Sequence, residues 1–427
     1  MWEKDFEDSD YPAVLSDLTA LVEEHSAWIS RDCLNLVSAH NVMSPQARAM
    51  LSSGLADRIM AGRIGNRDHA GSRFIDRIEE ICIAVARRLF GARFVEYRPM
   101  SGTISNGISI YAITRQGDSV LAWPKKYGGH FTFQDEGYPF YRNLKVSDIP
   151  CEGDDVGLVD FGSLEESIAT EKPSAIILGS STALFPFPLK RIADLASEAG
   201  AKVMYDGAHV MGLIAGGVFQ DPLREGAALL SGSTQKTIPG PVGGLILTND
   251  QSVATSVQLT ADRLITNYQN NRVASLTVAL LELSSFGRSL ADKVVMNARA
   301  LAGALSKQGL VVLCKRQGFT ASHQLLVDAS GLGGATDAVK RLEDANILST
   351  RIPIPSDYPS HTEAPGGLRF GTNEVTRFGM GPKEMRAIAQ LITRTIADRE
   401  DPRSIRKEVL ELKRPFDRLR FAFGSSD

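Results

Sequence analysis

AKVMYDGAH at residues 201–209 and AALLSGSTQKTIPGPVGG at residues 227–244 indicate the fold of this chain. Each stretch opens with an apolar run of strand length and continues directly into polar and glycine-rich residues. Asp206 closes the first run, and Lys236 follows the second after a short segment rich in Ser and Thr. Because ligands bind outside the carboxyl ends of the strands in open parallel sheets, both residues are candidates for one site.

Apolar runs of similar length lie on both sides of these stretches. They are DSVLAW (118–123), SAIILG (174–179) and GLILT (244–248), and helical spacing separates several of them, notably at 162–171 and 188–199. Strands that alternate with helices indicate an α/β fold in which a mostly parallel sheet is sandwiched by helices.

The rest of the chain has a different pattern. We expect further helices at 13–29, 73–90, 289–308, 335–345 and 382–398. In the second of these, one broad apolar face is expected to hold Ile75, Ile78, Ile81, Ile83 and Val85. The expected division is an N-terminal arm and helix at 1–45, a large cofactor-binding domain at 46–285 and a smaller C-terminal α+β domain at 286–427.

Composition excludes several classes of protein. The chain has 427 residues, 43% of them hydrophobic, with a formal net charge of only −3, so it can bury a large core and carries no basic stripe for nucleic acid. The basic residues near the end are interleaved with acids and are predicted to form a solvated helix face: Arg403, Arg406, Lys407, Lys413 and Arg414.

The cellular location of the protein can be predicted from its cysteine spacing and its N-terminal segment. The four cysteines, Cys33, Cys82, Cys151 and Cys314, form no CxxC pair, which disfavours a disulfide framework or a metal site. The N-terminal segment MWEKDFEDSD is acidic, unlike a signal peptide, and no apolar run approaches the ~20 residues of a membrane helix. We therefore expect a cytoplasmic protein without a membrane partner.

A carboxylate and a lysine at neighbouring strand ends suit pyridoxal 5'-phosphate (PLP) above other cofactors. PLP needs a lysine amine for its Schiff base and an acid to keep its pyridine nitrogen protonated. Lys236 and Asp206 supply both groups. Taken singly, each has a plain alternative, a surface lysine and an aspartate that caps a helix.

Two further segments support this interpretation. In SGTISNG (101–107), Ser101, Gly102 and Thr103 stand at an expected helix start, where amides and hydroxyls bind a phosphate. In GGH (128–130), the glycines allow close backbone approach and His130 presents a flat ring able to stack on a pyridine.

Taken together, these segments resemble the serine hydroxymethyltransferase family, fold-type I PLP enzymes of the aspartate aminotransferase superfamily. The resemblance runs from about residue 33 to 398, and its motifs are LVSAHN (36–41), RRLFGA (87–92), SGTISNG, GGH, DGAHVMGLIAGG (206–217), TQKTIPGPVGG (234–244) and GGLRFGT (366–372).

The resemblance implies a role for each matching residue. Lys236 would carry the Schiff base, and Asp206 would face the pyridine nitrogen. The remaining expected cofactor contacts are Ser101, Gly102 and Thr103 at the phosphate, His130 on the ring, His209 and Ser181 near the phenolic oxygen, and Gln235 before the lysine. Arg369 would bind the carboxylate of an amino-acid substrate.

Departures from the family pattern are as informative. Folate-using members carry a segment of the form YAEGYPGxRYYGG, which aligns here with IMAGRIGNRDHAG (59–71). The glutamate position is Ala61, the first tyrosine is Ile59, and the later tyrosine pair is Asp68–His69. Alanine cannot transfer a proton, so folate-dependent serine–glycine interconversion is doubtful.

Other motif positions differ too. A substrate-contacting serine and glutamate become Ala39 and His40, the histidine before the lysine becomes Gln235, and an arginine before the paired glycines becomes Val242. His69 and His40 are candidates for the proton transfers that the missing residues cannot make, or else are ordinary polar residues near an interface.

Several segments resemble instead the branch that contains L-threonine transaldolases: GGVFQDPL (216–223), KTIPGP (236–241), GFTASHQ (318–324) and STRIPIP (349–355). The favoured hypothesis is therefore a folate-independent aldolase or transaldolase acting on a β-hydroxy amino acid in specialised metabolism. Open alternatives are β-elimination or decarboxylating oxidative deamination of a cysteine conjugate, as in lincosamide pathways, folate-dependent hydroxymethyl transfer, and a non-catalytic PLP-fold binding protein. The resemblance also implies a homodimer with shared active sites, to which 59–71 and 264–272 would contribute.

Overall fold

The computed structural model describes residues 10–360 and 363–424. The acidic segment at residues 1–9, on which the expectation about targeting rests, lies outside the described residues.

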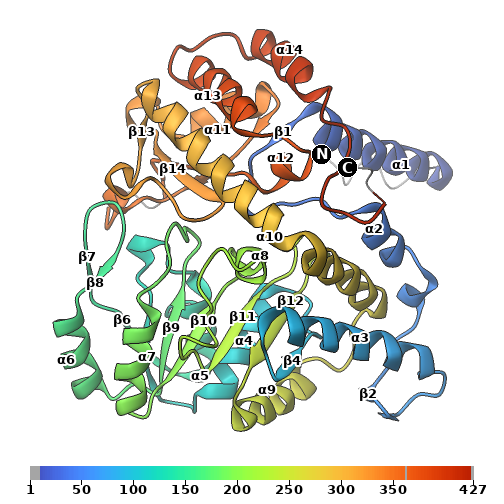
Figure 1. The fold of residues 1–427 in the computed structure, drawn as a ribbon, viewed down its shortest axis with the longest axis vertical. Helices are drawn as coiled ribbons and strands as arrows, with labels where there is room; N and C mark the ends of the chain where they lie inside the picture. Colours follow the sequence, from blue (N-terminus) through green and yellow to red (C-terminus); the bar gives the residue numbers. More distant parts are fainter. Residues whose placement is uncertain (1–9, 361–362, 425–427) are drawn as a thin grey trace.

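A seven-stranded sheet forms the centre of the larger part of the molecule (Figure 1). In spatial order its strands are β4 (Phe94–Glu96), β12 (Gly244–Thr248), β11 (Leu229–Ser233), β10 (Lys202–Asp206), β9 (Ala175–Gly179), β5 (Ser119–Ala122) and β6 (Lys145–Asp148). Only β12 runs against its neighbours. The predicted α/β fold with a mostly parallel sheet is confirmed.

Helices connect and cover these strands, because the central strands β9, β11 and β12 are buried along their whole length and cannot face water. They are α3 (Arg73–Phe90), α4 (Gly102–Ile113), α5 (Tyr138–Arg142), α6 (Phe161–Glu171), α7 (Leu189–Glu198), α8 (Met211–Ala215) and α9 (Gln251–Leu264). The short pairs β2 (Gly62–Arg63) with β3 (Asn66–Arg67) and β7 (Cys151–Glu152) with β8 (Leu158–Val159) lie outside the sheet.

A smaller antiparallel sheet lies on the other side of α10 (Asn270–Lys307), in the upper half of Figure 1. Its order is β13 (Val311–Val312), β14 (Gln324–Asp328), β17 (Gly367–Gly371) and β16 (Thr350–Ile352). The helices of this part are α11 (Ala335–Asp344), α12 (Asn373–Arg377), α13 (Pro382–Ile396) and α14 (Pro402–Lys413). Near the start of the described chain come α1 (Tyr11–Ala27), β1 (Leu34–Asn35), which pairs with β15 (Ile347–Leu348), and α2 (Pro45–Leu51).

Two large apolar cores form around the two sheets, and α10 contributes to both. Leu34 and Leu36 belong to the core of the smaller sheet, although they precede the large sheet in sequence. The division at residues 45 and 285 stays a prediction.

The long helix α10 begins well before the expected residue 289. Its first half is buried on almost every side, so it has no polar face to produce a helical period in the sequence. Asn270 and Asn271, which look like loop residues, donate to the carbonyls of Arg58 and Leu51.

Two expectations about exposure are wrong. Ile81 is 37% exposed, while Glu79 is buried on the inner face of α3 because hydroxyl and guanidinium groups meet its charge there. Lys413 is only 3% exposed and lies over the ring of Phe378, so the basic tail is not a wholly solvated face. Within the described residues, every helix is too short or too polar to cross a membrane.

Candidate active site

The candidate site lies at the carboxyl ends of β10 and β11. Asp206 is the last residue of β10 and stands beside Ser231 of β11. The segment after β10 carries His209, and the segment after β11 carries Lys236. The Lys236 Nζ atom lies 3.1 Å from His209 Nε2, so the two strand ends meet in one site.

The amine of Lys236 is in an environment that disfavours its charge. Burial, together with the nearby guanidinium of Arg369, lowers the pKa of Lys236 to about 8, although the carboxylate of Asp206 opposes the shift. The backbone carbonyl of Lys236 accepts from Asn41 Nδ2 at 2.7 Å, which fixes the loop at residues 36–41 against the lysine. At pH 7 this pKa leaves roughly a tenth of the amine unprotonated, far more than in an ordinary lysine.

Asp206 is held by donors on both of its oxygens. Its Oδ2 accepts from Asn106 Nδ2 at 2.9 Å, and its Oδ1 accepts from the Ala208 amide at 2.8 Å. Asn106 is in turn oriented by the Ser231 hydroxyl, which donates to Asn106 Oδ1 at 2.9 Å. These bonds orient the carboxylate, as is needed in a partner for a protonated ring nitrogen.

The predicted phosphate-binding turn is at a helix start. The Ser101 hydroxyl caps α4 by accepting from the Ile104 amide at 3.1 Å. Gly102 must lack a side chain, because a Cβ there would lie 2.9 Å from Cβ of Ser233. Thr103 is exposed in the first turn of α4. The arrangement is able to bind a phosphate through amides and hydroxyls.

His130 is half-buried, with Nδ1 2.8 Å from the Thr132 hydroxyl, and burial lowers the pKa of its imidazole. Ser181 follows β9, and its carbonyl accepts from Arg369 Nη1 at 2.6 Å. Gln235 precedes the lysine in sequence, and its Oε1 is buried with no hydrogen-bond partner among residues 10–360 and 363–424.

Arg369 brings the smaller sheet into the site. It lies on β17, is 7% exposed, and its Nε is buried without a partner. Burial lowers the pKa of Arg369 to about 10, which still leaves it charged at neutral pH. A buried guanidinium with an unmet donor is suited to bind a carboxylate.

Behind the lysine, His209 is buried between the two sheets. Its Nδ1 lies 2.7 Å from Gln324 Nε2, and its ring stacks on His323 at 5.8 Å and 17°. Burial lowers the pKa of His209 well below its usual value, and that of His323 to about 3. Both imidazoles are neutral at physiological pH.

Ala39 and His40 lie on the loop at residues 36–41. The His40 Nδ1 is 3.4 Å from Asn35 Nδ2, and the same amide donates to Glu374 at 2.7 Å. Burial raises the pKa of Glu374 to about 7, although Lys413 and the bond from Asn35 lower it. The loop that adjoins Lys236 is thus tied to a buried carboxyl group.

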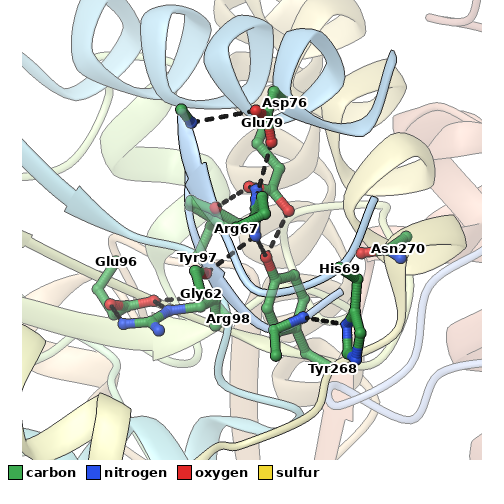
Figure 2. Close-up of polar contacts among 12 residues, drawn as sticks. Gly62, Arg67, His69, Asp76, Glu79, Glu96, Tyr97, Arg98, Tyr268 and Asn270 are labelled. Atoms are coloured by element: carbon green, nitrogen blue, oxygen red, sulfur yellow. Dashed lines mark hydrogen bonds and ion pairs between the residues drawn. The ribbon is translucent and has the colours of Figure 1, made fainter. Parts of the chain in front are cut away.

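The segment at residues 59–71 is anchored within its own chain (Figure 2). Arg67 donates to Asp76 at 2.8 Å, to Tyr268 at 3.0 Å and to the buried Glu79. This anchoring orients His69, whose Nδ1 accepts from the Ala61 amide at 3.1 Å. His69 is exposed, and its hydrogen bond is to Ala61, not to Lys236.

A cavity of about 270 Å³ lies beside Ala61. Asp68 and Asp262 line it, and Asp262 is paired with Arg63 and Arg98, each at 2.7 Å. Ala61 contributes only a methyl group at this place.

Three residues that carry the site's geometry were missed from sequence: Asn106, His323 and Gln324. Asn106 stands in a motif that was examined only for phosphate contacts. The other two lie in GFTASHQ, and their position opposite Lys236 depends on how the smaller sheet packs.

Comparison with known proteins agrees with this arrangement. A model of the serine hydroxymethyltransferase family matches residues 16–392. The serine hydroxymethyltransferase of Methanopyrus kandleri is 40% identical over 404 residues, which cover 95% of this chain and 94% of that protein. That of Pyrobaculum neutrophilum is 38% identical over 414 residues, with 96% and 95% covered.

Among solved structures, L-threonine transaldolase from Pseudomonas fluorescens matches with a TM-score of 0.87 at 25% identity, covering 97% of this chain and 94% of that one. The fold and the site therefore define a PLP-dependent enzyme of fold type I that acts on an amino acid. The chain belongs to the serine hydroxymethyltransferase family.

The buried carboxyl group of Glu374 predicts a pH dependence of stability. Its pKa in the folded protein, about 7, lies above the ordinary 4.5, so the folded chain keeps a proton that the unfolded chain loses in this range. Glu374 should therefore contribute a fall in stability, on the order of 3 kcal/mol, as the pH rises from about 4.5 to 7. The buried histidines, whose pKa values are lowered, contribute in the opposite direction, so the contribution of Glu374 is measured as a difference between variant and wild type.

Glu374→Gln keeps an acceptor for Asn35. Its free energy of unfolding, measured with urea at several pH values, should gain on that of the wild type as the pH rises through this range. The control Glu80→Gln changes a half-exposed carboxylate and should show no such gain. A difference between Glu374→Gln and wild type that stays constant over this range contradicts the prediction.

Proposed function

We propose that Lys236 holds PLP covalently and that Asp206 pairs with its pyridine nitrogen. The residues present fit this cofactor: a buried amine of lowered pKa, an oriented carboxylate, a helix start for the phosphate and a half-buried histidine ring for stacking. Ser181, His209 and Gln235 would complete the contacts, with Ser101, Gly102 and Thr103 at the phosphate.

When bound, PLP supplies an electron sink that stabilises negative charge on the substrate's Cα. Arg369 binds the substrate carboxylate, because its buried Nε has no partner within the described residues. A carboxylate held in this way is retained while a bond from Cα to another substituent is broken. The arrangement favours cleavage at Cβ over decarboxylation.

The proposed activity is folate-independent cleavage of the Cα–Cβ bond of a β-hydroxy amino acid, as an aldolase or transaldolase. The observation that carries it is Ala61, which places a methyl group where folate-using relatives have a proton-transferring glutamate. On the wall of the cavity beside Ala61, the charge of Asp262 is balanced by ion pairs with Arg63 and Arg98. The likeness to L-threonine transaldolase supports the same activity.

Proton transfer would fall to His69 and His40. The Nδ1 atom of His69 accepts from the Ala61 amide, which leaves Nε2 as the nitrogen available for proton transfer. Because His69 is exposed in its own chain, we propose that it acts in the active site of a neighbouring copy.

Folate-dependent hydroxymethyl transfer is the second candidate. The relatives at 38% and 40% identity that bear the name serine hydroxymethyltransferase favour it. The two candidates differ in whether a one-carbon acceptor is needed.

The test is aldehyde release by the PLP-loaded protein. We expect acetaldehyde from L-threonine without tetrahydrofolate, and the same rate when tetrahydrofolate is added. His69→Ala should lower this rate by about 10²-fold or more, whereas Lys190→Ala, at an exposed position on α7, should leave it unchanged.

Strong acceleration of L-serine cleavage by tetrahydrofolate would contradict the proposal and support the second candidate. Silence with L-threonine, together with pyruvate or carbon dioxide from an S-substituted cysteine, would contradict both.

We further propose that the chain forms a homodimer. On α1, five apolar side chains are each more than half exposed: Tyr11, Leu15, Leu18, Leu21 and Val22. Exposed apolar residues at helical spacing are suited to burial against a second surface. A second copy would cover them and would give His69 an active site to enter. A cytoplasmic location stays a prediction.

Size-exclusion chromatography with light-scattering detection of the molar mass tests this proposal. The wild-type mass should be twice the 46.3 kDa of the chain, and Leu15→Glu combined with Leu18→Glu should shift it toward the monomer. Leu158→Glu, at an exposed leucine on β8, should stay dimeric. A monomeric wild type refutes the dimer.

A further inference from the structure

His209 lies between Lys236, which follows β11 of the large sheet, and Gln324, the first residue of β14 in the smaller sheet. On one side, Nε2 faces the Lys236 amine at 3.1 Å, and on the other, Nδ1 faces Gln324 Nε2 at 2.7 Å. His209 is 6% exposed, and Gln324 is fully buried. The Nε2 atom of Gln324 has its partner in His209, whereas Gln324 Oε1 and His323 Nδ1 are buried without a hydrogen-bond partner within the described residues.

The amide of Gln324 determines which nitrogen of His209 carries the proton. Gln324 Nε2 is a donor, so Nδ1 of the histidine must accept. A neutral imidazole has one acceptor and one donor nitrogen, and the proton then sits on Nε2. Burial keeps His209 neutral, since it lowers the pKa of the ring well below its ordinary value.

The proton on Nε2 constrains the lysine. An ammonium group has three donors and no acceptor, so it cannot pair with an N–H. The uncharged amine has a lone pair that accepts from Nε2. The contact between Lys236 and His209 is thus favourable only while the amine is unprotonated.

We propose that Gln324 is a positioning residue which, by donating to Nδ1 of His209, holds the Lys236 amine in its uncharged, nucleophilic form. This inference rests on the proposed role of Lys236 in holding PLP. It assigns to the smaller sheet a part in preparing the lysine, in addition to the carboxylate-binding Arg369 of the neighbouring strand β17.

Other charged and titratable groups face the same junction. Arg369, His323 and His130 lie near His209 and lower its pKa. The carboxylate of Asp206 raises the pKa of Lys236, whereas burial and Arg369 lower it. The backbone carbonyl of Ser38 engages His323 Nε2 at 3.2 Å. All these groups are unchanged by substitution at Gln324, so its own contribution can be measured.

Nitrogen NMR of histidine-labelled full-length protein, prepared without PLP, tests the tautomer directly. The His209 signals, assigned by their loss in His209→Asn, should report a protonated Nε2 and an unprotonated Nδ1. The opposite tautomer would overturn the proposal. This measurement needs no variant of Gln324.

The second measurement is the pH dependence of the rate at which added PLP becomes covalently attached. In Gln324→Glu the new carboxylate accepts from His209 Nδ1, which moves the ring proton from Nε2 to Nδ1. The midpoint of the pH profile of the attachment rate should then rise by about one pH unit, which corresponds to about tenfold less uncharged amine at a given lower pH. Gln324→Leu only removes the donor and should give a smaller rise.

Gln220→Leu is the matched control, since Gln220 is also buried and hydrogen-bonded but contacts Phe187 and Tyr205. Its midpoint should equal that of the wild type. An unchanged midpoint in both folded Gln324 variants overturns the inference. Failure of the proposed role of Lys236 looks different, because PLP would then attach to another lysine in every variant.

Discussion

Burial of the Lys236 amine is the constraint on which the rest of the site depends. Removing an ammonium from water is costly, and the nearby Arg369 adds repulsion, so the amine is driven toward its uncharged form. Asp206 limits this effect by its opposite charge. The lysine is held only because β10 and β11 are adjacent and parallel, which brings the two strand ends to the same edge of the sheet.

The smaller sheet completes this environment. Arg369 on β17 and Gln324 on β14 come from neighbouring antiparallel strands, and both are buried against the ends of the large sheet. A change in the packing of the two sheets would therefore alter carboxylate binding and the state of the lysine together. The long helix α10 contributes to both cores and fixes this packing.

The sequence predicted the α/β fold, the PLP dependence and the family, because strand ends follow from short apolar runs and the residues after them are distinctive. It did not predict contacts that depend on side-chain packing. Asn106 orients Asp206 from another element, and Arg67 anchors the segment around Ala61 through the buried Glu79. The spacing of apolar residues also failed to predict the first half of α10, because that half is buried on almost every side and has no polar face.

The most direct test of the central claim is borohydride reduction of the PLP-loaded protein followed by peptide mass spectrometry. The mass of the reduced cofactor is expected on the peptide that contains Lys236, and folded Lys236→Ala should carry none. Cofactor fixed to a different lysine, or a folded wild type that takes up no PLP, would contradict the account.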